Sequence, residues 1–491
     1  MINLDLSSQS DSELIIGIIS PIGTDTRDVI YHITEHLKTI NYKTEVINIS
    51  SDVISQFKGN DTTFATEYER IKAYIDLGNS ARNNAKDNSI LMKGAASIIY
   101  SEREGDEPAP KSRTAYIIKS IKHPDEISFL RKVYGVGFYL IGVTSTLDNR
   151  LKYLTLEKNI PKDKANELLD RDANENIGHG QHTQDAFQES DYFILEGDSK
   201  EELKNSVYRF IDLLFGSPFI TPCFDEYAMF MAYAASLRSA DLSRQIGAVI
   251  AKDNEILASG VNDCPKFGGG LYWPILNENN AYIDEEQGRD YKCGNDPNKM
   301  EQQKIIENIL EELGLEKKPE FIDKIKKAGI SSLTEYGRVV HGEMEAILMC
   351  SRNNISCKGA SLYVTTFPCH NCAKHIIAAG ISTVTYIEPY PKSKALVFHK
   401  HEITEKSSEA KEKVLFKPFV GVGPHRYSDL FSINSIMWGK RVRKDSTGQA
   451  VKWKPETANL RTPMQVFNYI ESEKLAYKLF AEEISSSIKE E

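Results

Sequence analysis

The sequence predicts an α/β protein with two domains, and three observations lead to this prediction. The chain has 491 residues, more than a single hydrophobic core usually holds. In its first half, short runs of β-branched residues alternate with helical segments, which is the pattern of a parallel sheet covered by helices on both faces. All seven cysteines lie beyond residue 222, so the two halves also differ in composition.

The first half opens as a strand, a turn and a helix. An apolar run at residues 14–19 precedes the turn "SPIGTDT", and residues 27–40 then show helical periodicity. Later strands and helices are expected at residues 43–50, 114–121, 124–135, 138–145, 191–198 and 200–216. This order predicts a parallel-sheet domain over residues 1–216.

A second domain is expected over residues 222–491, because prolines and a glycine interrupt the pattern just before it. It begins with a helix from Asp225 and a hairpin within residues 246–262. The charged and partly helical residues 275–335 are interpreted as an insertion. The remaining elements are a strand, a helix and a strand, expected at residues 361–367, 369–379 and 383–390.

Composition narrows the class of protein. Hydrophobic residues make up 41% and charged residues 26%, which is the balance of a folded protein. The net charge of −10 argues against a protein that coats nucleic acid. No run approaches the roughly 18 apolar residues of a membrane span, and no positive secretory leader is present. We expect a cytoplasmic protein without a membrane partner, whose cysteines are thiols or metal ligands rather than disulfides.

The stretch "RVVHGEMEAILMC", residues 338–350, places one histidine and two glutamates in an apolar helix. His341, Glu343 and Glu345 are consistent with a solvated helix edge, a metal site, or a catalytic acid or base beside one. Helix geometry alone favours Glu345 as the partner of His341, because the two are four residues apart. The side chains expected to face the core are Val339, Val340, Met344, Ile347 and Leu348.

Two cysteines in "TTFPCHNCAKHIIAAG" complete a metal-binding pattern. Cys369 and Cys372 share a face at the start of a predicted helix, whose N-terminus stabilises thiolates. By itself this spacing also fits a redox dithiol or two buried thiols. With His341 the pair supplies three zinc ligands and leaves the fourth position open for water, as in catalytic zinc sites. A closed structural site that includes His375 is the alternative.

A glutamate beside such a site would move protons during hydrolysis. The spacing H-x-E followed by P-C-x-x-C is the signature of the zinc nucleobase deaminases, and here it is met by His341, Glu343 and Pro368 with the two cysteines. The pattern therefore predicts Zn²⁺ as the cofactor and Glu343 as the catalytic residue. Glu345 is interpreted as a surface or supporting carboxylate.

The second half resembles the cytidine deaminase superfamily, and within it the deoxycytidylate deaminases. Beyond the zinc motif, the segments "SRQIGAVIAKDNEILASGVNDCP" and "YIEPYPKSKA" are similar to that family. The whole chain, with a P-loop-kinase-like first half, resembles the bacterial anti-phage deoxycytidine nucleotide deaminases through "KSIKHPDEISFLRKVYG", "LLDRDANENIGHGQHTQDAF" and "FVGVGPHRYSDLF". The resemblance implies a P-loop-kinase-like parallel-sheet domain followed by a cytidine-deaminase-like α/β/α domain.

The resemblance also implies an activity, namely hydrolytic deamination of dCTP, and of dCMP, which would drain the dCTP pool that phage replication needs. Glu343 would move protons to N3 of cytosine and then to the leaving ammonia. Asn262 stands where the family contacts the nucleotide sugar. The related deaminases are oligomers, so a homo-oligomer is expected. Basic residues next to the motifs are candidates for binding the triphosphate, or else surface charges, and they are Arg244, Lys266 and Arg426.

The first half departs from a working P-loop, which reads G-x-x-x-x-G-K-[ST]. With Gly23 as the second glycine, Thr24 stands where the lysine belongs and Asp25 where the hydroxyl belongs. Nucleotide hydrolysis and kinase activity are therefore not expected. Backbone N–H groups of Gly23, Thr24, Asp25 and Thr26 would suit a regulatory nucleotide, although Asp25 would oppose an anion. A purely structural domain is the alternative.

Three other functions compete with this interpretation. A deaminase acting on single-stranded DNA or RNA would need a basic, aromatic groove, and the acidic net charge argues against one. A housekeeping dCMP deaminase of pyrimidine metabolism would carry the same zinc motif. A nucleotide-sensing protein regulated by an RNA or protein partner would carry the zinc as a structural ion.

Overall fold

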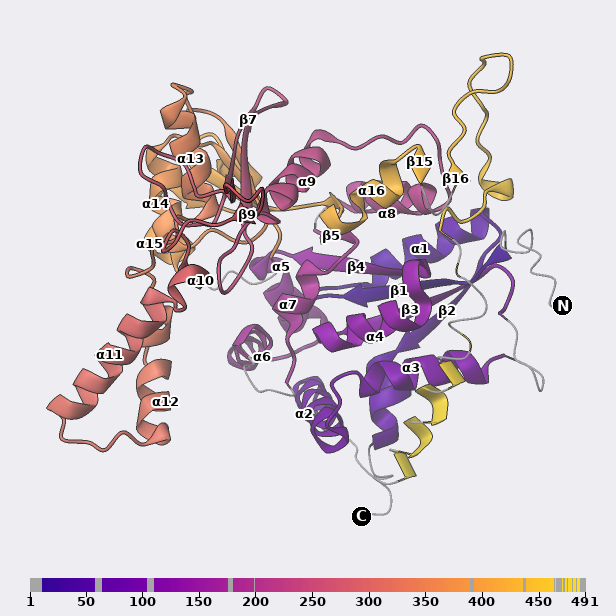
Figure 1. The fold of residues 1–491 in the computed structure, drawn as a ribbon. Helices are drawn as coiled ribbons and strands as arrows, with labels where there is room; N and C mark the ends of the chain where they lie inside the picture. The colour runs from indigo at the N-terminus through magenta and orange to yellow at the C-terminus, as the bar shows by residue number, and fades with distance from the viewer. Residues whose placement is uncertain are drawn as a thin grey trace. The chain divides into compact units, whose positions relative to one another are not determined.

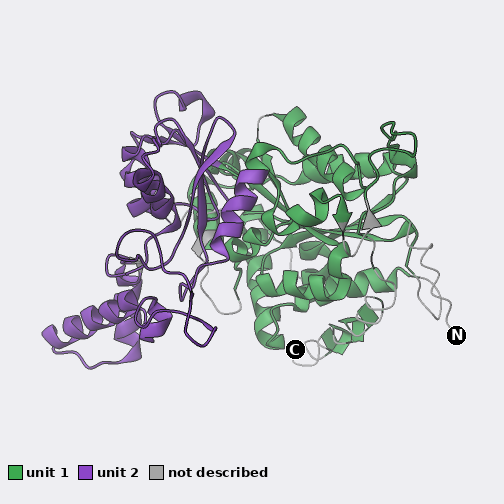
Figure 2. Cartoon of the chain, turned by 45° about the horizontal axis from the view of Figure 1, so that its top comes forward, with its two compact units in different colours: residues 1–226, 388–390, 418–491 green, residues 227–387, 391–417 purple. Residues whose placement is uncertain are grey.

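The computed structural model resolves two compact units. Unit 1 comprises residues 1–226, 388–390 and 418–491, and unit 2 comprises residues 227–387 and 391–417 (Figure 2). The residues described below are 11–57, 64–103, 110–174, 180–197, 199–388, 393–435 and 439–462, with scattered positions beyond 462. Residues 389–392 of "YIEPYPKSKA" and 175–179 of "LLDRDANENIGHGQHTQDAF" lie outside them.

Unit 1 is built on a six-stranded sheet in the order β14-β5-β4-β1-β3-β2. Its strands are β1 (Leu14–Ile19), β2 (Lys43–Asn48), β3 (Thr114–Ile121), β4 (Phe138–Ser145), β5 (Tyr192–Glu196) and β14 (Gly421–Val422). The five long strands run parallel, and β14 is antiparallel to β5. The predicted parallel sheet is confirmed, and its strands are apolar because helices cover both faces.

Helices α1 (Arg27–Thr39) and α8 (Lys200–Leu214) lie side by side on one face of this sheet (Figure 1). Side chains such as Ile33 and Phe210 pack with Ile16 of β1 in one buried cluster. Helices α4 (Pro124–Tyr134) and α7 (Thr183–Gln188) cover the opposite face. The other helices of unit 1 are α2 (Glu67–Ala85), α3 (Ile90–Ser101), α5 (Leu147–Lys152), α6 (Lys162–Asn174) and α16 (Tyr427–Phe431).

The end of the chain differs from the predicted domain boundary. Residues from 418 onward were expected in the second domain, but they belong to unit 1. Val422 pairs with Tyr192 at the edge of the sheet, and its N–H donates to Glu226 at 2.8 Å. The physical reason is that strand β14 of this segment pairs with β5, whose edge backbone groups would otherwise be unpaired.

Arg426 fixes this returning segment inside unit 1. Its guanidinium is buried, lies 3.0 Å from a carboxylate oxygen of Asp191 and donates to the carbonyl of Phe138 at 2.8 Å. The second oxygen of Asp191 accepts the N–H of Leu140 at 2.7 Å. Arg426 was predicted to bind substrate phosphate, but its donors are used within unit 1, so the structure gives it a structural role instead.

Unit 2 is built on a second six-stranded sheet in the order β12-β13-β11-β10-β6-β7. Its strands are β6 (Gly247–Lys252), β7 (Glu255–Val261), β10 (Ser361–Val364), β11 (Thr383–Tyr386), β12 (Ile403–Thr404) and β13 (Val414–Pro418). Strands β6 and β7 form the predicted hairpin, and β10 runs parallel to β11. Its main helices are α9 (Phe224–Ser236), α13 (Gly342–Arg352) and α14 (His370–Ala378), with a short α15 (Ala395–Phe398).

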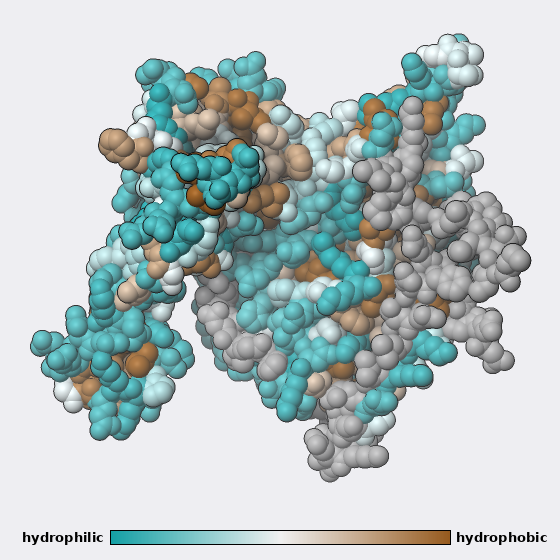
Figure 3. Space-filling model, in the orientation of Figure 1, coloured by the Kyte–Doolittle hydropathy of each residue, from teal (hydrophilic) through white to brown (hydrophobic). Residues whose placement is uncertain are grey.

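Residues 275–335 contain helices and two short strands that lie outside the six-stranded sheet. They are β8 (Ile275–Leu276), β9 (Tyr282–Ile283), α10 (Asp290–Cys293), α11 (Pro297–Glu312) and α12 (Pro319–Lys327). None of the residues of α12 is buried, and Figure 3 shows the α11–α12 region covered mostly by hydrophilic side chains. Within the described part of the chain, no helix is both long and apolar enough to cross a bilayer.

The Arg426–Asp191 pair generates a prediction about stability. Replacing Arg426 by Met removes one partner of a buried ion pair, so we expect the free energy of unfolding to fall by about 3 kcal/mol. Urea-induced unfolding measures this change. Arg244→Met is the matched control, because Arg244 is exposed and its loss should cost less than about 0.5 kcal/mol. Equal stability of the two variants would contradict the structural role of Arg426.

Candidate metal centre

Close packing of α13 on β7 determines where the first metal donor lies. A Cβ atom on Gly260 would come within 2.1 Å of the Gly342 carbonyl oxygen and 2.4 Å of the Ala346 nitrogen. Because Gly260 has no side chain, the helix lies directly on the strand. The bridge between Asp263 and Val340 then aligns the residues that lead into the helix.

Helix α13 begins later than predicted. The sequence favoured a helix over 338–350, whereas the structure starts it at Gly342 with His341 as the N-cap residue. The side chains that face the sheet therefore shift, so that Ala346 and Cys350 are buried while Leu348 is 39% exposed. His341 thus has an extended backbone just before the helix, and its side chain points toward the cysteines of α14.

The second helix brings the two cysteines. The loop after β10 is held by the Thr365 N–H, which donates to the Gly247 carbonyl at 3.1 Å, and by the Gly247 N–H, which donates to the Thr365 hydroxyl at 3.2 Å. Cys369 is the N-cap of α14, and its sulfur accepts the N–H of Cys372 at 3.4 Å. The positive end of the helix dipole therefore lies at both sulfurs.

The three predicted donors meet between the two helix N-termini. His341 Nδ1 lies 3.3 Å from Cys372 Sγ and 3.4 Å from Cys369 Sγ, and the three donor atoms all lie within 4.8 Å of one another. Tetrahedral zinc with ordinary Zn–S and Zn–N bonds separates such atoms by about 3.6 Å. One imidazole and two sulfurs also form a donor set that zinc prefers, so these residues fit Zn²⁺.

Electrostatics in the cluster favour a positive charge between the sulfurs. The hydrogen bond from Cys372 lowers the pKa of the Cys369 thiol to about 4, and hydrogen bonding with Cys369 raises the pKa of His341 to about 9. The pKa of Cys372 is raised well above its usual value, first by its hydrogen bond with Cys369 and then by burial. These ligands must lose their protons to bind a metal. A metal cation would therefore take the place of the protons in this group of two sulfurs and an imidazole.

The two glutamates of α13 have different surroundings. Glu343 is only 3% exposed, and burial raises the pKa of its carboxyl group. Glu345 is also buried, but its carboxylate forms an ion pair with Arg352 and is not part of the metal group. The prediction that Glu345 is a surface residue is therefore wrong, and its ion pair with Arg352 fits the predicted supporting carboxylate instead.

Neither His375, the predicted alternative ligand, nor the nearby His370 joins the cluster, and Cys264 does not join it either. His375 Nδ1 lies 2.7 Å from the carbonyl oxygen of Asn371, and the His370 ring contacts Phe398 edge-on. Cys264 lies against Asp290, with its sulfur 3.4 Å from a carboxylate oxygen. Among the residues that the structure describes, only His341, Cys369 and Cys372 bring three such donor atoms close enough together to hold a metal ion. The fourth coordination position is thus left to a water or a substrate.

The residues predicted to bind substrate have different surroundings in the structure. The side-chain oxygen of Asn262 accepts the N–H of Ile246 at 2.7 Å, and its amide donates to the carbonyl of Arg244 at 2.8 Å. Asn262 therefore holds the loop that precedes β6. The Arg244 side chain is exposed, and Lys266 forms an ion pair with Glu285. Arg426 belongs to unit 1 as described above.

Sequence reasoning missed Asp241, which shapes the same loop. Its carboxylate accepts the N–H groups of Ser243 and Arg244 at 2.8 and 2.9 Å, and its charge contributes to the raised pKa of His341. The signal was present as an aspartate two residues before a serine, which is an Asx turn. In unit 1, the predicted residues Gly23, Thr24, Asp25 and Thr26 form the connection from β1 to α1.

Removal of one sulfur generates a prediction about metal content. We expect the purified chain to hold one zinc per molecule and Cys372→Ala to bind zinc at least tenfold more weakly, because a three-donor site loses a ligand. Metal analysis by mass spectrometry after dialysis measures this. Cys357→Ala is the control, because Cys357 is a buried thiol outside the cluster. Full zinc retention in Cys372→Ala would contradict the site.

Comparison with known proteins identifies the family. Residues 223–388 match the model for the "Cytidine and deoxycytidylate deaminase zinc-binding region". The deoxycytidylate deaminase of Enterobacteria phage T4 is 32% identical over 173 residues, which cover 33% of this chain and 77% of the phage protein. The deoxycytidylate deaminase of Mus musculus is 29% identical over 163 residues, covering 33% of this chain and 63% of that protein.

Among solved structures, the apo dCMP deaminase of cyanophage S-TIM5 is 17% identical and gives a TM-score of 0.23, over 41% of this chain and 100% of that chain. The T4 protein is matched over more than two thirds of its length, and the segment that matches the family model contains all three metal donors. This chain therefore belongs to the cytidine and deoxycytidylate deaminase family and is a zinc-dependent deaminase that acts on carbon–nitrogen bonds.

Proposed function

We propose that this chain deaminates deoxycytidine nucleotides, converting dCTP to dUTP and dCMP to dUMP, and that it depletes dCTP as a defence against phage. The observation that carries the activity is the buried Glu343 beside a three-donor metal site with one position left open. The names of the T4 and mouse relatives support a deoxycytidine nucleotide as the substrate. Resemblance to anti-phage deaminases supports the triphosphate and the defence role.

The reaction adds water to C4 of cytosine and releases ammonia, leaving a carbonyl oxygen at C4. His341, Cys369 and Cys372 would hold Zn²⁺, which would supply Lewis acidity that lowers the pKa of water at the site. Glu343 accepts a proton from that water and delivers it to N3 of the ring. It then takes the remaining proton from the C4 hydroxyl and gives it to the amine, so that ammonia leaves as the C4 carbonyl forms. Burial suits Glu343 to this work, because a raised pKa brings its neutral and charged forms closer in free energy at neutral pH.

We assign the three polar residues near β6 and β7 to substrate binding. Asn262 acts as a positioning residue for residues 244–246, with remaining hydrogen-bonding capacity for the sugar. Arg244 is exposed at that loop and has its guanidinium available for phosphate. Lys266 can reach a phosphate only by leaving Glu285, so its contribution is smaller.

Unit 1 is proposed to be a P-loop-kinase-like regulatory domain. Its support is a parallel sheet with β1 at the centre and a loop that leads from β1 directly into α1. The missing lysine and hydroxyl of the loop argue for a regulatory role rather than phosphoryl transfer. We further propose a cytoplasmic homo-oligomer, in which an RNA or protein partner restrains the deaminase before infection.

A housekeeping dCMP deaminase is the second candidate, and the names of the matched relatives favour it. It would share the site and differ only in the preferred phosphate chain. A structural zinc in a nucleotide-sensing protein is disfavoured, because a structural site is usually closed by a fourth protein ligand. A polynucleotide deaminase remains opposed by the acidic net charge of −10.

A substrate panel tests the activity. Purified protein is offered dCTP, dCMP, deoxycytidine and single-stranded DNA separately, and uracil products are quantified by chromatography. We expect turnover of the nucleotides, with kcat at least about 10²-fold lower in Glu343→Gln and zinc retained, because only proton transfer is removed. Glu345→Gln is the matched control on the same helix and should keep both zinc and most turnover. Reaction of the polynucleotide alone would refute the proposal.

The defence role has its own test in cells. Bacteria that express the wild-type chain are infected with phage, and their nucleotide pools are followed by mass spectrometry. We expect dCTP to fall after infection and phage yield to drop, whereas cells that express Glu343→Gln should keep dCTP at the level of cells without the protein. Identical dCTP pools with both chains would leave a housekeeping dCMP deaminase as the better description.

A further inference from the structure

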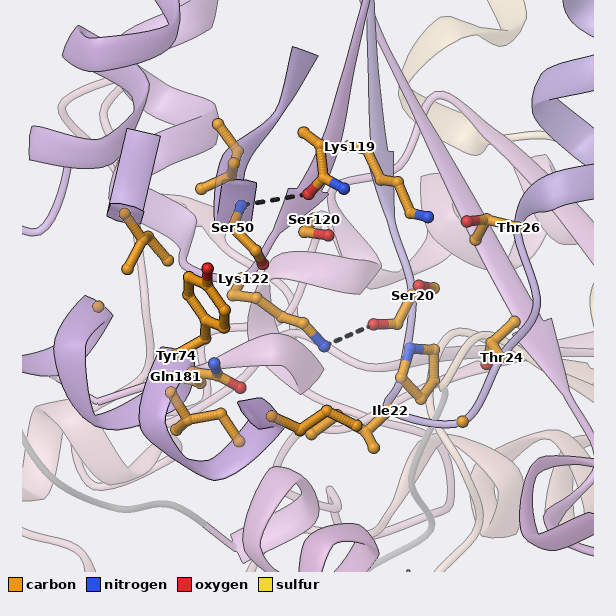
Figure 4. A pocket seen from close by; sticks show the side chains of 18 of the residues that line it. Ser20, Ile22, Thr24, Thr26, Ser50, Tyr74, Lys119, Ser120, Lys122 and Gln181 are labelled. Atoms are coloured by element: carbon orange, nitrogen blue, oxygen red, sulfur yellow. Dashed lines mark hydrogen bonds between the residues drawn. The ribbon is translucent and has the colours of Figure 1, made fainter. Parts of the chain in front are cut away.

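Unit 1 contains a cavity of about 240 Å³ where β1 and β3 end (Figure 4). Its polar lining comes mainly from the loop after β1, from the ends of β2 and β3 and the residues that follow them, and from α2, together with Lys158 and Gln181. In open parallel sheets, the crevice outside the carboxyl ends of the strands is the usual place for a ligand. The residues that carry the argument are Thr24, Tyr74, Lys119, Ser120, Lys122 and Lys158.

An irregularity in β3 places Lys119 in the lining of this cavity. Ile18 of β1 pairs with Lys119, but Ile19 pairs with Ile121, so Ser120 is an extra residue. Ser120 has φ = +81°, a left-handed conformation that serine rarely adopts. Such bulges redirect side chains and store strain, and both are common at functional sites. Here the bulge brings both Lys119 and Ser120 into the lining of the cavity.

Lys119 lacks a partner in this cavity. Its ammonium forms no hydrogen bond or ion pair with any described residue, and burial lowers its pKa. Lys122 differs, because its ammonium donates to the Ser20 carbonyl at 2.7 Å and lies 3.2 Å from Asp172. Figure 4 shows Lys122 directed at Ser20 and Lys119 directed toward Thr26. A partly buried, unpaired cation is costly, and an anionic ligand would remove that cost.

A second unpartnered group lies on the loop after β1. Thr24 is 9% exposed, and its hydroxyl has no hydrogen-bond partner among the described residues. Buried hydroxyls are normally satisfied, so this one indicates a ligand atom that would complete it. Thr24 stands at the position where a P-loop has its lysine, and the cavity instead receives a lysine from β3.

The acidic residue of the loop is paired with an arginine. The carboxylate of Asp25 accepts hydrogen bonds from the Arg27 guanidinium at 2.6, 2.9 and 3.0 Å, and Asp25 does not line the cavity. Its charge raises the pKa of Lys119, but the opposing effect of burial is larger. Arg70 and Lys158 line the cavity and share one carboxylate, Glu67, at 2.7 and 3.6 Å. The lining therefore carries more positive than negative charge.

The rest of the lining fits a flat organic body. Tyr74 and Tyr153 line the cavity together with the apolar side chains of Ile22, Ile71 and Leu154. The Arg70 guanidinium lies 5.5 Å from the Tyr74 ring centre, so charge and aromatic surface meet at that wall. Aromatic and apolar walls beside a cationic end match a ligand with a base at one end and phosphate at the other.

We propose that this cavity binds a nucleoside phosphate, with the Lys119 ammonium and the Thr24 hydroxyl contacting its phosphate and Tyr74 lying against its base. The site is separate from the deaminase centre and does not depend on the substrate proposed for it. Because the loop lacks the residues of phosphoryl transfer, the ligand is bound and not cleaved. Binding of this ligand makes unit 1 respond to the concentration of a nucleotide.

Direct binding to the full chain tests the proposal. The experiment uses Glu343→Gln protein, so that nothing is turned over, and titrates ATP, GTP, dTTP, adenosine and pyrophosphate by calorimetry. Cytosine nucleotides are left out, so a failure of the proposed deaminase activity cannot be mistaken for a failure here. We expect at least one nucleoside triphosphate to bind in the micromolar range, with adenosine and pyrophosphate each at least tenfold weaker.

Two substitutions assign that binding to the cavity. Lys119→Met should weaken it at least tenfold, and Thr24→Val should weaken it severalfold. Lys43→Met is the matched control, because Lys43 is an exposed lysine of β2 outside the cavity, and it should bind like its parent. Circular dichroism and zinc content confirm that each variant is folded.

Thermal unfolding without ligand separates binding from a structural role. Lys119→Met should melt at the same temperature as its parent or higher, because it removes an unpaired cation, yet lose the shift that the nucleotide causes. The proposal is overturned if no nucleoside triphosphate binds, if Lys119→Met binds like its parent, or if pyrophosphate binds as tightly as the nucleotides.

Discussion

The deaminase centre depends on how closely α13 can approach the sheet beneath it. At Gly260 the backbone of β7 lies against the backbone of α13, where a single methyl group would collide with Gly342 and Ala346. This contact holds the N-terminus of the helix, with both His341 and Glu343, beside the N-terminus of α14. A displacement of α13 would move a metal donor and the proposed proton carrier together, so one packing constraint maintains both.

The second requirement is that two helix N-termini meet. Cys369 is the N-cap of its helix and His341 the N-cap of the other, so each donor sits where backbone N–H groups point outward. This geometry stabilises thiolate sulfur and orients the donors toward one point. Residues that hold the adjoining loops, such as Thr365 and Asn262, act through backbone hydrogen bonds rather than by touching the metal.

Burial of a polar group has different consequences in the two units. In unit 2, Glu343 lies in a nearly solvent-free position, and the resulting rise in its pKa suits it to carry a proton. In unit 1, Arg426 is equally enclosed, but Asp191 and a carbonyl oxygen satisfy it, so it only joins the end of the chain to the sheet. Lys119 is the intermediate case, because it is partly buried and forms no hydrogen bond or ion pair with any residue that the structure describes. A buried charged residue whose partner is supplied by the protein, such as Arg426, therefore has a structural role. One without such a partner, such as Lys119, is a candidate for binding a ligand.

The sequence by itself determined the parallel sheet of unit 1, the β6–β7 hairpin and the three zinc donors, because these depend on local periodicity and on fixed spacing along the chain. Through the H-x-E spacing it also predicted Glu343, rather than Glu345, as the catalytic residue. Tertiary structure alone decided that residues from 418 onward return to unit 1, that Arg426 is a structural residue, and that Lys119 lines a cavity beside the loop after β1. The physical reason is that edge pairing, buried ion pairs and cavities are made by residues far apart in sequence, and no local pattern records their meeting.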